Sequence, residues 1–392
     1  MDSLLNQRTE LLSSLPEWTQ SEGRVAIVHD WMTGMRGGEA ILDSICSLFP
    51  KADLYTLLWT DKQMSPSILN GRKVETSYLQ GLMKLPSMAK GYRKLLPIFP
   101  HAISSFDLSG YDLILSNTHC VAKGVRTRKD AVHVSYVSTP MRYVWDMFDD
   151  YFGAGKTNLP TQILAKLVRK PLQHWDEGSN DRIDALMANS RFVQKRIHDF
   201  WHRESVVVHP FVYLDRFPLK EEKVGNYYLL VSALAPYKRV DLAIEAFRRL
   251  GLPLIIVGRG QDEAKLRAMA APNIQFLGGL SNESIAELYR KCKAFLFPGL
   301  EDFGITPLEA MACGRPVIAY GRGGLLDTVT EKTGVFFPEQ NVESLMEAVK
   351  KMESGEVNFS PADCRARAEE FTQQVFEKKY IKTLADAIAA KK

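Results

Sequence analysis

The chain has 392 residues, of which 45% are hydrophobic and 24% charged, and its formal net charge is +4. That length is more than one compact core usually holds, so two domains are expected. A net charge this small does not favour a nucleic-acid partner, and no apolar run approaches the roughly 20 residues that span a bilayer. The five cysteines are an odd number without any C-x-x-C pair, which favours a reduced, cytoplasmic protein without a zinc site.

Short β-branched runs alternate with longer amphipathic segments, a pattern typical of parallel sheets built from βαβ units. Two series of strands are expected, at residues 24–30, 111–117, 131–138, 185–190 and 205–210, and then at 226–234, 253–260, 274–279, 294–299, 316–320 and 334–337. A charged, proline-interrupted segment over residues 211–226 separates the two series. The sequence therefore predicts an α/β fold with two doubly wound, Rossmann-like domains.

The expected domain boundaries follow from this division. They are an N-terminal extension over residues 1–23, an N-terminal domain over 24–213, a C-terminal domain over 214–375, and a last helix over 376–392 that could return to the N-terminal domain. In open parallel sheets a ligand binds beyond the C-terminal ends of the strands. The cleft between two facing sheets is therefore the expected position of a site.

The stretch LEDFGITPLEAMACGRPVIAYGRGG, residues 300–324, contains a loop and then a helix that is expected to begin near Thr306 or Pro307 and end at Gly314. The backbone N–H groups of Gly304, Ile305 and Thr306 then point out of the helix N-terminus, where the helix dipole favours an anion. This turn therefore predicts a phosphate-binding position.

Two glutamates lie on either side of the turn. Glu309, one turn into the helix, can accept hydrogen bonds from a vicinal diol such as a ribose, and Glu301 lies on the preceding loop. Alternatively, Glu309 only complements the helix dipole and Glu301 is a solvated loop acid. Neighbouring motifs favour the first interpretation.

Three further motifs fall at expected strand ends. Lys238 and Arg239 precede another helix, where two cations can neutralise a diphosphate, although an exposed pair at a helix start is the alternative. Glycine pairs, one at residues 323–324 and one formed by Gly37 and Gly38, let backbone approach a ligand closely. One glycine-rich turn is a weak signal, but four elements at strand ends predict a site for a phosphorylated ligand that carries hydroxyl groups.

The spacing from Glu301 to Glu309 is the E-x7-E motif, and residues from about 24 to 380 resemble family 4 of the retaining GT-B glycosyltransferases. The stretches VAIVHDWMTGMRGGE, TPMRYVWD, PYKRVDLAIEAF and EDFGITPLEAMACGRPVIAYGRGG look like a bacterial branch that assembles surface polysaccharides, often by mannosyl transfer, as O-antigen mannosyltransferases do. The resemblance implies a GT-B fold, in which two facing Rossmann-like domains enclose an interdomain cleft.

The resemblance also implies an enzyme that moves a hexose, most often mannose from GDP-mannose, onto a glycan or a polyprenyl-diphosphate-linked acceptor in surface-polysaccharide synthesis. The co-substrate is then a nucleotide sugar. No metal or other cofactor is expected, since the chain lacks the D-x-D triplet with which metal-dependent sugar-nucleotide enzymes often hold magnesium. Two alternatives stay open: a UDP-sugar-dependent glucosyl- or galactosyltransferase on the same scaffold, and a weakly active or non-catalytic assembly subunit.

The same resemblance implies a role for each motif. Lys238 would bind the donor diphosphate with Arg239 close by, aided by backbone donors at residues 304–306. Glu309 would hold the ribose hydroxyls, and Glu301 would contact hydroxyls of the transferred sugar. Without a protein nucleophile, the reaction would be a front-face displacement in which the leaving diphosphate takes the acceptor's proton, so stabilising that diphosphate would dominate catalysis.

Glycines are implied to bring the backbone close to the rest of the donor. The nucleotide base would lie against the loops at residues 257–261 and 276–280, where Gly258 lets the chain come closest. Gly37 and Gly38 would let the N-terminal domain close over the phosphate.

The sequence departs from the family at two positions. Where relatives commonly have a histidine before the Thr-Pro of STPMRY, this chain has Ser138, whose hydroxyl can bond a sugar but cannot titrate near neutrality. His119, in SNTHCVAKG, either contributes a sugar contact in its place or caps a strand end. Many family members also have an arginine where this chain has Ala233, and Lys238 and Arg239 are expected to suffice without it.

Two segments of the expected N-terminal domain, residues 78–100 and 161–175, are basic and amphipathic. Their cations include Lys84, Lys90, Arg93, Lys94, Lys166, Arg169 and Lys170. Such segments predict peripheral contact with an anionic membrane, at the inner face of the cytoplasmic membrane. The alternative is two ordinary surface helices that turn an apolar face inward.

Overall fold

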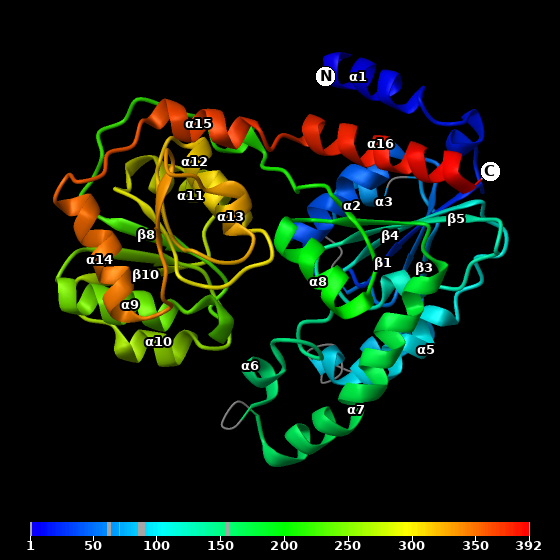
Figure 1. Ribbon diagram of the computed structural model, residues 1–392, viewed down its shortest axis with the longest axis horizontal. Coiled ribbons are helices and arrows are strands. Elements are labelled where there is room, and N and C mark those ends of the chain that lie inside the picture. Colours follow the sequence, from blue (N-terminus) through cyan, green and yellow to red (C-terminus); the bar gives the residue numbers. More distant parts are fainter. Residues whose placement is uncertain (1, 61–63, 70, 85–90, 154–156, 392) are drawn as a thin grey trace. The chain divides into compact units, whose positions relative to one another are not determined.

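The computed structural model of the chain describes residues 2–60, 64–69, 71–84, 91–153 and 157–391 (Figure 1). These residues divide into two compact units, of which the first comprises the chain up to Val208 together with the residues from Glu377 onward, and the second comprises His209–Phe376. Each unit is built on one parallel β-sheet with associated helices. The predicted α/β fold of two Rossmann-like domains is therefore confirmed.

The sheet of the first unit has, among the described residues, seven parallel strands in the order β3-β2-β1-β4-β5-β6-β7. The strands are β1 (Val25–His29), β2 (Asp53–Thr56), β3 (Val74–Thr76), β4 (Leu113–Thr118), β5 (Val132–Val137), β6 (Ala185–Ala188) and β7 (Val206–Val207). The helices that the structure describes in this unit are α1 (Asp2–Leu12), α2 (Gly37–Leu48), α3 (Pro66–Leu69), α5 (Phe99–Ser104), α6 (Phe148–Phe152), α7 (Leu159–Gly178), α8 (Arg191–Trp201) and most of α16 (Gln373–Lys391).

Strand β1 lies inside this sheet, between β2 and β4, and is buried along its whole length, as a parallel strand covered on both faces requires. Its last residue, His29, lies opposite Thr56 of β2 and Asn117 of β4. The chain runs from β1 outward to β2 and β3, but from β4 outward in the other direction to β7. The neighbouring strands β1 and β4 therefore flank a topological switch point, where open α/β sheets form a crevice for ligands.

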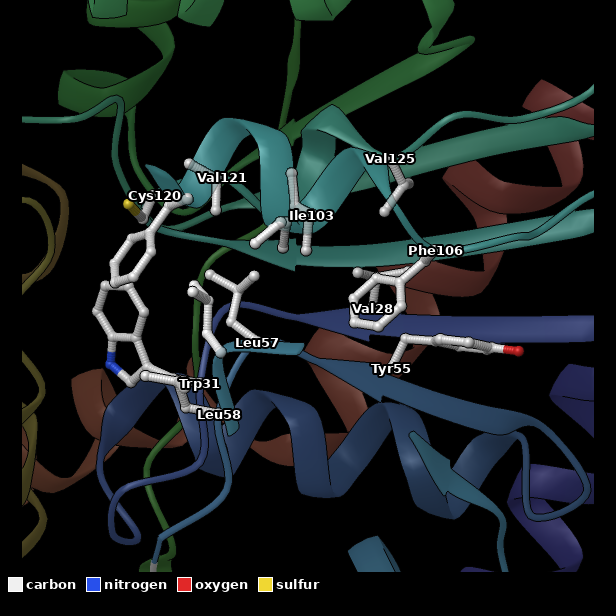
Figure 2. Close-up of a cluster of buried hydrophobic side chains, with 14 of the residues drawn as sticks. Val28, Trp31, Tyr55, Leu57, Leu58, Ile103, Phe106, Cys120, Val121 and Val125 are labelled. Carbon is white, nitrogen blue, oxygen red and sulfur yellow. The ribbon is translucent and has the colours of Figure 1, made fainter. Parts of the chain in front are cut away.

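A hydrophobic cluster joins this sheet to the segments around it. Val28 of β1, Tyr55 of β2, Ile103 of α5 and Val121, just after β4, belong to this cluster and are drawn together in Figure 2. Trp31, two residues beyond the end of β1, belongs to the same cluster. The core therefore extends to the C-terminal ends of the strands and holds the loops there in place.

Helix α16 completes the first unit (Figure 1). The Glu377 carboxylate accepts hydrogen bonds from Arg8 Nη2 of α1 at 2.6 Å and from Ser44 Oγ of α2 at 2.9 Å. Near the other end of the helix, Lys391 forms an ion pair with Asp184 at 2.8 Å. The buried side chains of α16 in this unit recur every three or four residues, at Glu377, Tyr380, Ile381, Thr383, Leu384, Ala387 and Ile388.

The sheet of the second unit has, within the described chain, six parallel strands in the order β10-β9-β8-β11-β12-β13. The strands are β8 (Tyr228–Val231), β9 (Leu254–Val257), β10 (Ile274–Gly278), β11 (Phe295–Phe297), β12 (Val317–Tyr320) and β13 (Gly334–Phe337). The helices are α9 (Val240–Leu250), α10 (Glu263–Met269), α11 (Asn282–Lys291), α12 (Ile305–Ala312), α13 (Leu325–Thr328), α14 (Val342–Glu353) and α15 (Pro361–Glu369). By the same reasoning as in the first unit, the switch point lies between β8 and β11.

All five cysteines are buried thiols, and none takes part in a disulfide. Among the helices that the structure describes, none combines the length and the apolar character needed to cross a bilayer.

Candidate functional site

Lys238 and Glu301 lie on the two loops that flank the switch point of the second unit. Lys238 ends a short 3₁₀ turn, Pro236–Lys238, after β8, and Glu301 follows β11. The Lys238 ammonium group forms an ion pair with the Glu301 carboxylate, and only 15% and 13% of the two side chains are exposed. A Cβ at Gly299 would lie 2.9 Å from Lys238 Cα, so the glycine allows the two loops to approach this closely.

Aromatic rings surround the Lys238 ammonium group. Its Nζ lies 5.2 Å from the ring centre of Tyr237 and 5.5 Å from that of Phe297. Lys238 also lines a shallow recess together with Ser232 and Pro298. A cation held over ring faces and partly withdrawn from water attracts an anion more strongly than a solvated lysine does. This environment suits a ligand phosphate.

Arg239 turns to different partners. Its backbone is left-handed, with φ of 52°, at the N-terminus of α9. Its Nε donates to Asp241 Oδ1 at 3.1 Å, and its Nη1 donates to Gln340 Oε1 at 3.4 Å. Because a left-handed residue turns the chain sharply, the consecutive cations Lys238 and Arg239 find separate carboxylates. The predicted contact of Arg239 with a phosphate stays a prediction.

The phosphate-binding turn predicted at Gly304 is a real helix start. Helix α12 begins at Ile305, and Gly304 precedes it with φ of 90°, a conformation that side-chain-bearing residues rarely adopt. A Cβ at Gly304 would also lie 3.2 Å from Leu325 Cδ2. The first N–H groups of an α-helix have no partner within it, and Ile305 and Thr306 are partly exposed. The turn therefore presents backbone N–H groups that are suited to binding an anion.

The second glycine run, Gly323 and Gly324, packs against the loop that carries Glu301. Gly324 N donates to Glu301 O at 2.8 Å, and a Cβ at Gly324 would lie 2.2 Å from Asp302 O. A Cβ at Gly323, whose φ is 75°, would lie 2.5 Å from Glu301 O. The close approach that these glycines allow is thus to the protein's own backbone, where the sequence suggested a ligand. Their effect is to fix the loop of Glu301.

Glu309 lies one turn into α12 and accepts a hydrogen bond from Tyr289 Oη at 3.1 Å. Burial raises the pKa of Glu309 to about 7, while the Tyr289 hydrogen bond and the charge of Arg216 act in the opposite direction. Near neutral pH this carboxyl group is therefore divided between its charged and neutral forms. In the charged form it is an acceptor only, which is what a pair of ligand hydroxyls requires.

The loops predicted to lie against a nucleotide base are joined by glycine contacts. Gly258 has φ of 139°, and a Cβ there would lie 1.8 Å from Ser232 O. Its N–H donates to Gly278 O at 2.7 Å. The Arg259 side chain passes along Gly279, whose Cβ position is 3.5 Å from Arg259 Nε. Gly258 therefore ties the loops after β8, β9 and β10 into one surface.

The predicted residues of the first unit lie at the C-terminal edge of its own sheet. Gly37 and Gly38 open α2, and Gly38 O accepts a hydrogen bond from Asn117 Nδ2 at 2.8 Å. His119 follows β4 and Ser138 follows β5, and these two strands are neighbours. The structure thus brings these four predicted residues to strand ends around one switch point.

Two polar residues of these sites were not expected from the sequence. Asp30 directly follows β1, and its buried carboxylate lies 3.1 Å from the Nδ1 atom of His119. A signal for Asp30 existed, because a charged residue ends the otherwise apolar run of β1. Tyr289, which holds Glu309, lies on a different helix, and no local pattern marks it.

In its described residues, 78–84 and 91–100, the first basic segment forms short turns rather than one amphipathic helix. It comprises the 3₁₀ turns Tyr78–Lys84 and Tyr92–Ile98 and the first residues of α5. Lys90, one of its predicted cations, lies outside the described residues.

The second basic segment, residues 161–175, lies within α7. Arg169 turns inward there and donates to backbone oxygens of residues 144 and 145 at 2.9 and 2.8 Å. Lys166 and Lys170 stay exposed. Large apolar side chains that are more than half exposed lie on the same helix, at Leu159, Ile163, Leu164 and Leu167. The first three turns of α7 thus present an apolar stripe and two cations to the outside.

Comparison with known proteins identifies the second unit. Residues 213–375 match the family model described as "Glycosyl transferases group 1". O-antigen chain mannosyltransferase C of Escherichia coli is 31% identical over 169 residues, which are 41% of this chain and 43% of that protein. The GDP-mannose-dependent monoacylated alpha-(1-6)-phosphatidylinositol monomannoside mannosyltransferase of Corynebacterium glutamicum is 36% identical over 132 residues, which are 30% of this chain and 35% of that protein.

Solved structures extend the likeness to the whole chain at the level of the fold. Anabaena HepE in complex with UDP-glucose superposes with a TM-score of 0.64 at 17% identity, covering 92% of this chain and 99% of that one. Sucrose-phosphate synthase from Thermosynechococcus elongatus superposes with a TM-score of 0.66 at 16% identity, covering 94% and 100%. By sequence, the chain spans about half the length of the curated relatives it matches. Residues 213–375 therefore match a group 1 glycosyltransferase domain, and the chain shares its two-domain GT-B fold with these solved structures.

Proposed function

We propose that the chain transfers a hexose with retention of configuration, specifically mannose from GDP-mannose, onto a glycan or lipid-linked acceptor of surface-polysaccharide synthesis. The observation that carries this proposal is the pairing of Lys238 with Glu301 at the switch point of the group 1 domain, with Glu309 one turn into the next helix. The E-x7-E spacing and the names of the mannosyltransferase relatives support it.

In this proposal each charged group acts on one part of the donor. Lys238 stabilises the negative charge that grows on the diphosphate as its bond to the sugar breaks, and the start of α12 adds backbone donors. Glu301, held beside Lys238, accepts a hydrogen bond from a hydroxyl of the transferred sugar. Glu309 accepts hydrogen bonds from the ribose. Arg239 adds a second cation once the phosphate replaces Asp241 as its partner.

The reaction needs no protein nucleophile, because the leaving diphosphate takes the acceptor's proton as the new bond forms on the same face of the sugar. A double displacement would instead need two carboxylates about 5 Å apart that flank the scissile bond. Here Glu301 is paired with Lys238 and Glu309 with Tyr289, so neither is poised as an attacking group. Since Lys238 supplies the positive charge at the leaving group, no metal is part of the proposal.

The first unit would bind the acceptor. Its helix α7 presents Leu159, Ile163, Leu164 and Leu167 beside Lys166 and Lys170. An apolar stripe with cations at its edge suits an anionic membrane surface, where a lipid-linked acceptor resides. We therefore propose that the protein acts at the inner face of the cytoplasmic membrane.

A donor panel tests the proposal on the full chain. Thermal shift with GDP-mannose, GDP-fucose, UDP-glucose and UDP-galactose is followed by donor hydrolysis, with the anomer of the released sugar read by NMR. We expect stabilisation and hydrolysis with GDP-mannose, an α-anomer as first product, and the same rate in EDTA. Activity with UDP-sugars alone would assign the protein to UDP-dependent transfer, and no response to any donor would indicate a non-catalytic subunit.

A further inference from the structure

The switch point of the first unit holds a carboxylate and an imidazole in direct contact. Asp30 is the first residue after β1, and His119 is the first residue after β4, the strand beside it. The Nδ1 atom of His119 lies 3.1 Å from Asp30 Oδ2. The pair thus lies where the strand ends of an open parallel sheet form a crevice for a ligand.

The Asp30 carboxylate is fully buried and receives hydrogen bonds from the turn that follows β4. Its Oδ2 accepts from the backbone N–H groups of His119 and Cys120 at 2.6 and 2.9 Å. Its Oδ1 accepts from those of Val121 and Ala122 at 2.6 and 2.7 Å. Four backbone donors on two oxygens already satisfy a buried carboxylate and fix the turn. The imidazole is therefore not required to hold this loop.

The charge of the Asp30 carboxylate, 3.1 Å from Nδ1, favours one tautomer of the His119 ring. A carboxylate can only accept, so the Nδ1 atom that faces it carries the hydrogen, and Nε2 of the neutral ring is left as a hydrogen-bond acceptor. Burial lowers the pKa of His119, against the opposing charge of Asp30, and this favours the neutral ring. The other charged or titratable groups around it are His29, Glu39 and Arg142.

The surroundings of His119 differ from those of a core histidine. About a third of its side chain, 30%, is exposed, and its ring meets the ring of Trp31 edge-on with centroids 4.5 Å apart. By contrast, His133 on β5 is fully buried, and its Nε2 bonds to Ser116 Oγ at 2.8 Å. The chain thus contains one histidine with a wholly internal role and one that is positioned by Asp30 yet open to a ligand.

We infer that His119 binds a hydroxyl group of the sugar substrate through Nε2, and that Asp30 is the positioning residue that keeps this nitrogen an acceptor. The inference rests on the proposed function, because it takes the ligand to be a hydroxyl-rich sugar. It also accounts for Ser138, since a hydrogen-bond acceptor from the neighbouring strand end supplies the contact that a histidine at position 138 would make.

Variants of His119 test the role of Nε2. Asparagine places its amide near the position of Nδ1 and keeps a donor for Asp30, but it lacks a polar atom at the position of Nε2. Glutamine reaches that position. With the donor that the panel identifies, we expect His119→Asn to lower kcat/KM at least about tenfold and His119→Gln to retain more activity than His119→Asn, with melting temperatures near that of the unmodified protein. His198→Asn, at an exposed position of α8, is the matched control. An active His119→Asn variant would overturn the inference.

A second measurement does not depend on turnover. In the full chain labelled with ¹⁵N-histidine, long-range ¹H–¹⁵N correlation spectra should show the Nδ1–H tautomer for His119, and Asp30→Asn should shift it toward the Nε2–H tautomer. Finding the Nε2–H tautomer in the unmodified protein would refute the role of Asp30. If no nucleotide sugar is a substrate, the proposed function fails, while these spectra still decide whether Asp30 sets the ring.

Discussion

The hydroxyl group of Tyr289 donates to the Glu309 carboxylate across 3.1 Å, between helices α11 and α12. Tyr289 is fully buried in the core of the second unit, so core packing rather than solvent fixes the carboxyl group. Burial of the Glu309 carboxyl group itself raises its pKa to about 7 from its ordinary value of 4.5. Glu309, which is expected to hold a ribose, therefore also gains or loses a proton near neutral pH in the folded protein.

Glu309→Gln should change how stability depends on pH. A carboxyl group whose pKa is raised by folding stabilises the folded state below its unfolded pKa of 4.5, and this contribution is lost as pH rises through 7. Glutamine cannot lose a proton, so between pH 4.5 and 7.5 the variant should gain stability relative to the unmodified protein, on the order of 1–3 kcal/mol. Urea unfolding followed by circular dichroism at both pH values measures this difference. Parallel stability curves for the two proteins would show that Glu309 does not titrate in this range.

Lys238→Ala should lower donor turnover by at least about a hundredfold, because it removes the cation that we propose stabilises the leaving diphosphate. Circular dichroism should show an unchanged fold, since the ammonium group lies at the surface of a recess rather than in the core. Lys265→Ala, on the exposed side of α10, is the control and should keep full turnover. Turnover of Lys238→Ala within a few-fold of the unmodified protein would remove Lys238 from the proposed mechanism.

Glu301→Gln should separate phosphate binding from sugar transfer. The neutral amide no longer competes with a diphosphate for Lys238, so GDP without a sugar should bind about threefold to tenfold more tightly. Turnover of GDP-mannose should fall, because the amide is a poorer acceptor for the sugar hydroxyl than the carboxylate. Isothermal titration calorimetry with GDP, set beside Glu263→Gln on α10 as control, checks the first part. Equal or weaker GDP binding by Glu301→Gln would contradict the competition.

The outward face of α7 should bind anionic lipid. Co-sedimentation with vesicles that contain phosphatidylglycerol is expected for the unmodified chain, but not with vesicles of phosphatidylcholine alone. Replacing Ile163 and Leu167 by serine should abolish it, because these side chains supply the apolar contact. The same change at Val206 and Leu219, which are also exposed, should leave it intact. If the amount of sedimented protein is the same with and without phosphatidylglycerol, α7 does not bind anionic lipid and is an ordinary surface helix.

The strand series could be predicted because most strands are runs of apolar, β-branched residues between polar loops. Strands β2 and β3 could not, since their sequences DLYT and VET are short and carry acidic or threonine side chains. Their conformation comes from parallel pairing beside β1, which lies distant in sequence. The start of α12 was predicted to within two residues, because glycine and proline mark it locally.

The site was predicted as a set of motifs at strand ends, but the contacts among its residues were not. Lys238 and Glu301 meet although 63 positions separate them, and no spacing rule links a lysine to a glutamate across two βαβ units. The separation of Arg239 from Lys238 depends on one left-handed residue, which the sequence KRV does not indicate. Gly323 and Gly324 were placed at the correct strand end, yet only packing shows that the groups they approach are Asp302 and the backbone of Glu301.

The contacts of Glu377 with the first unit bear on the order in which the two units can fold during synthesis. Residues 377–392 belong to the first unit, yet they are synthesised after the whole of His209–Phe376. The second unit can therefore complete its folding on the ribosome before the first. In the first unit, Ser44 of α2 cannot form its hydrogen bond to Glu377 until α16 has been synthesised. Loss of the final helical turns would then harm the unit that was begun earliest, and leave the group 1 domain intact.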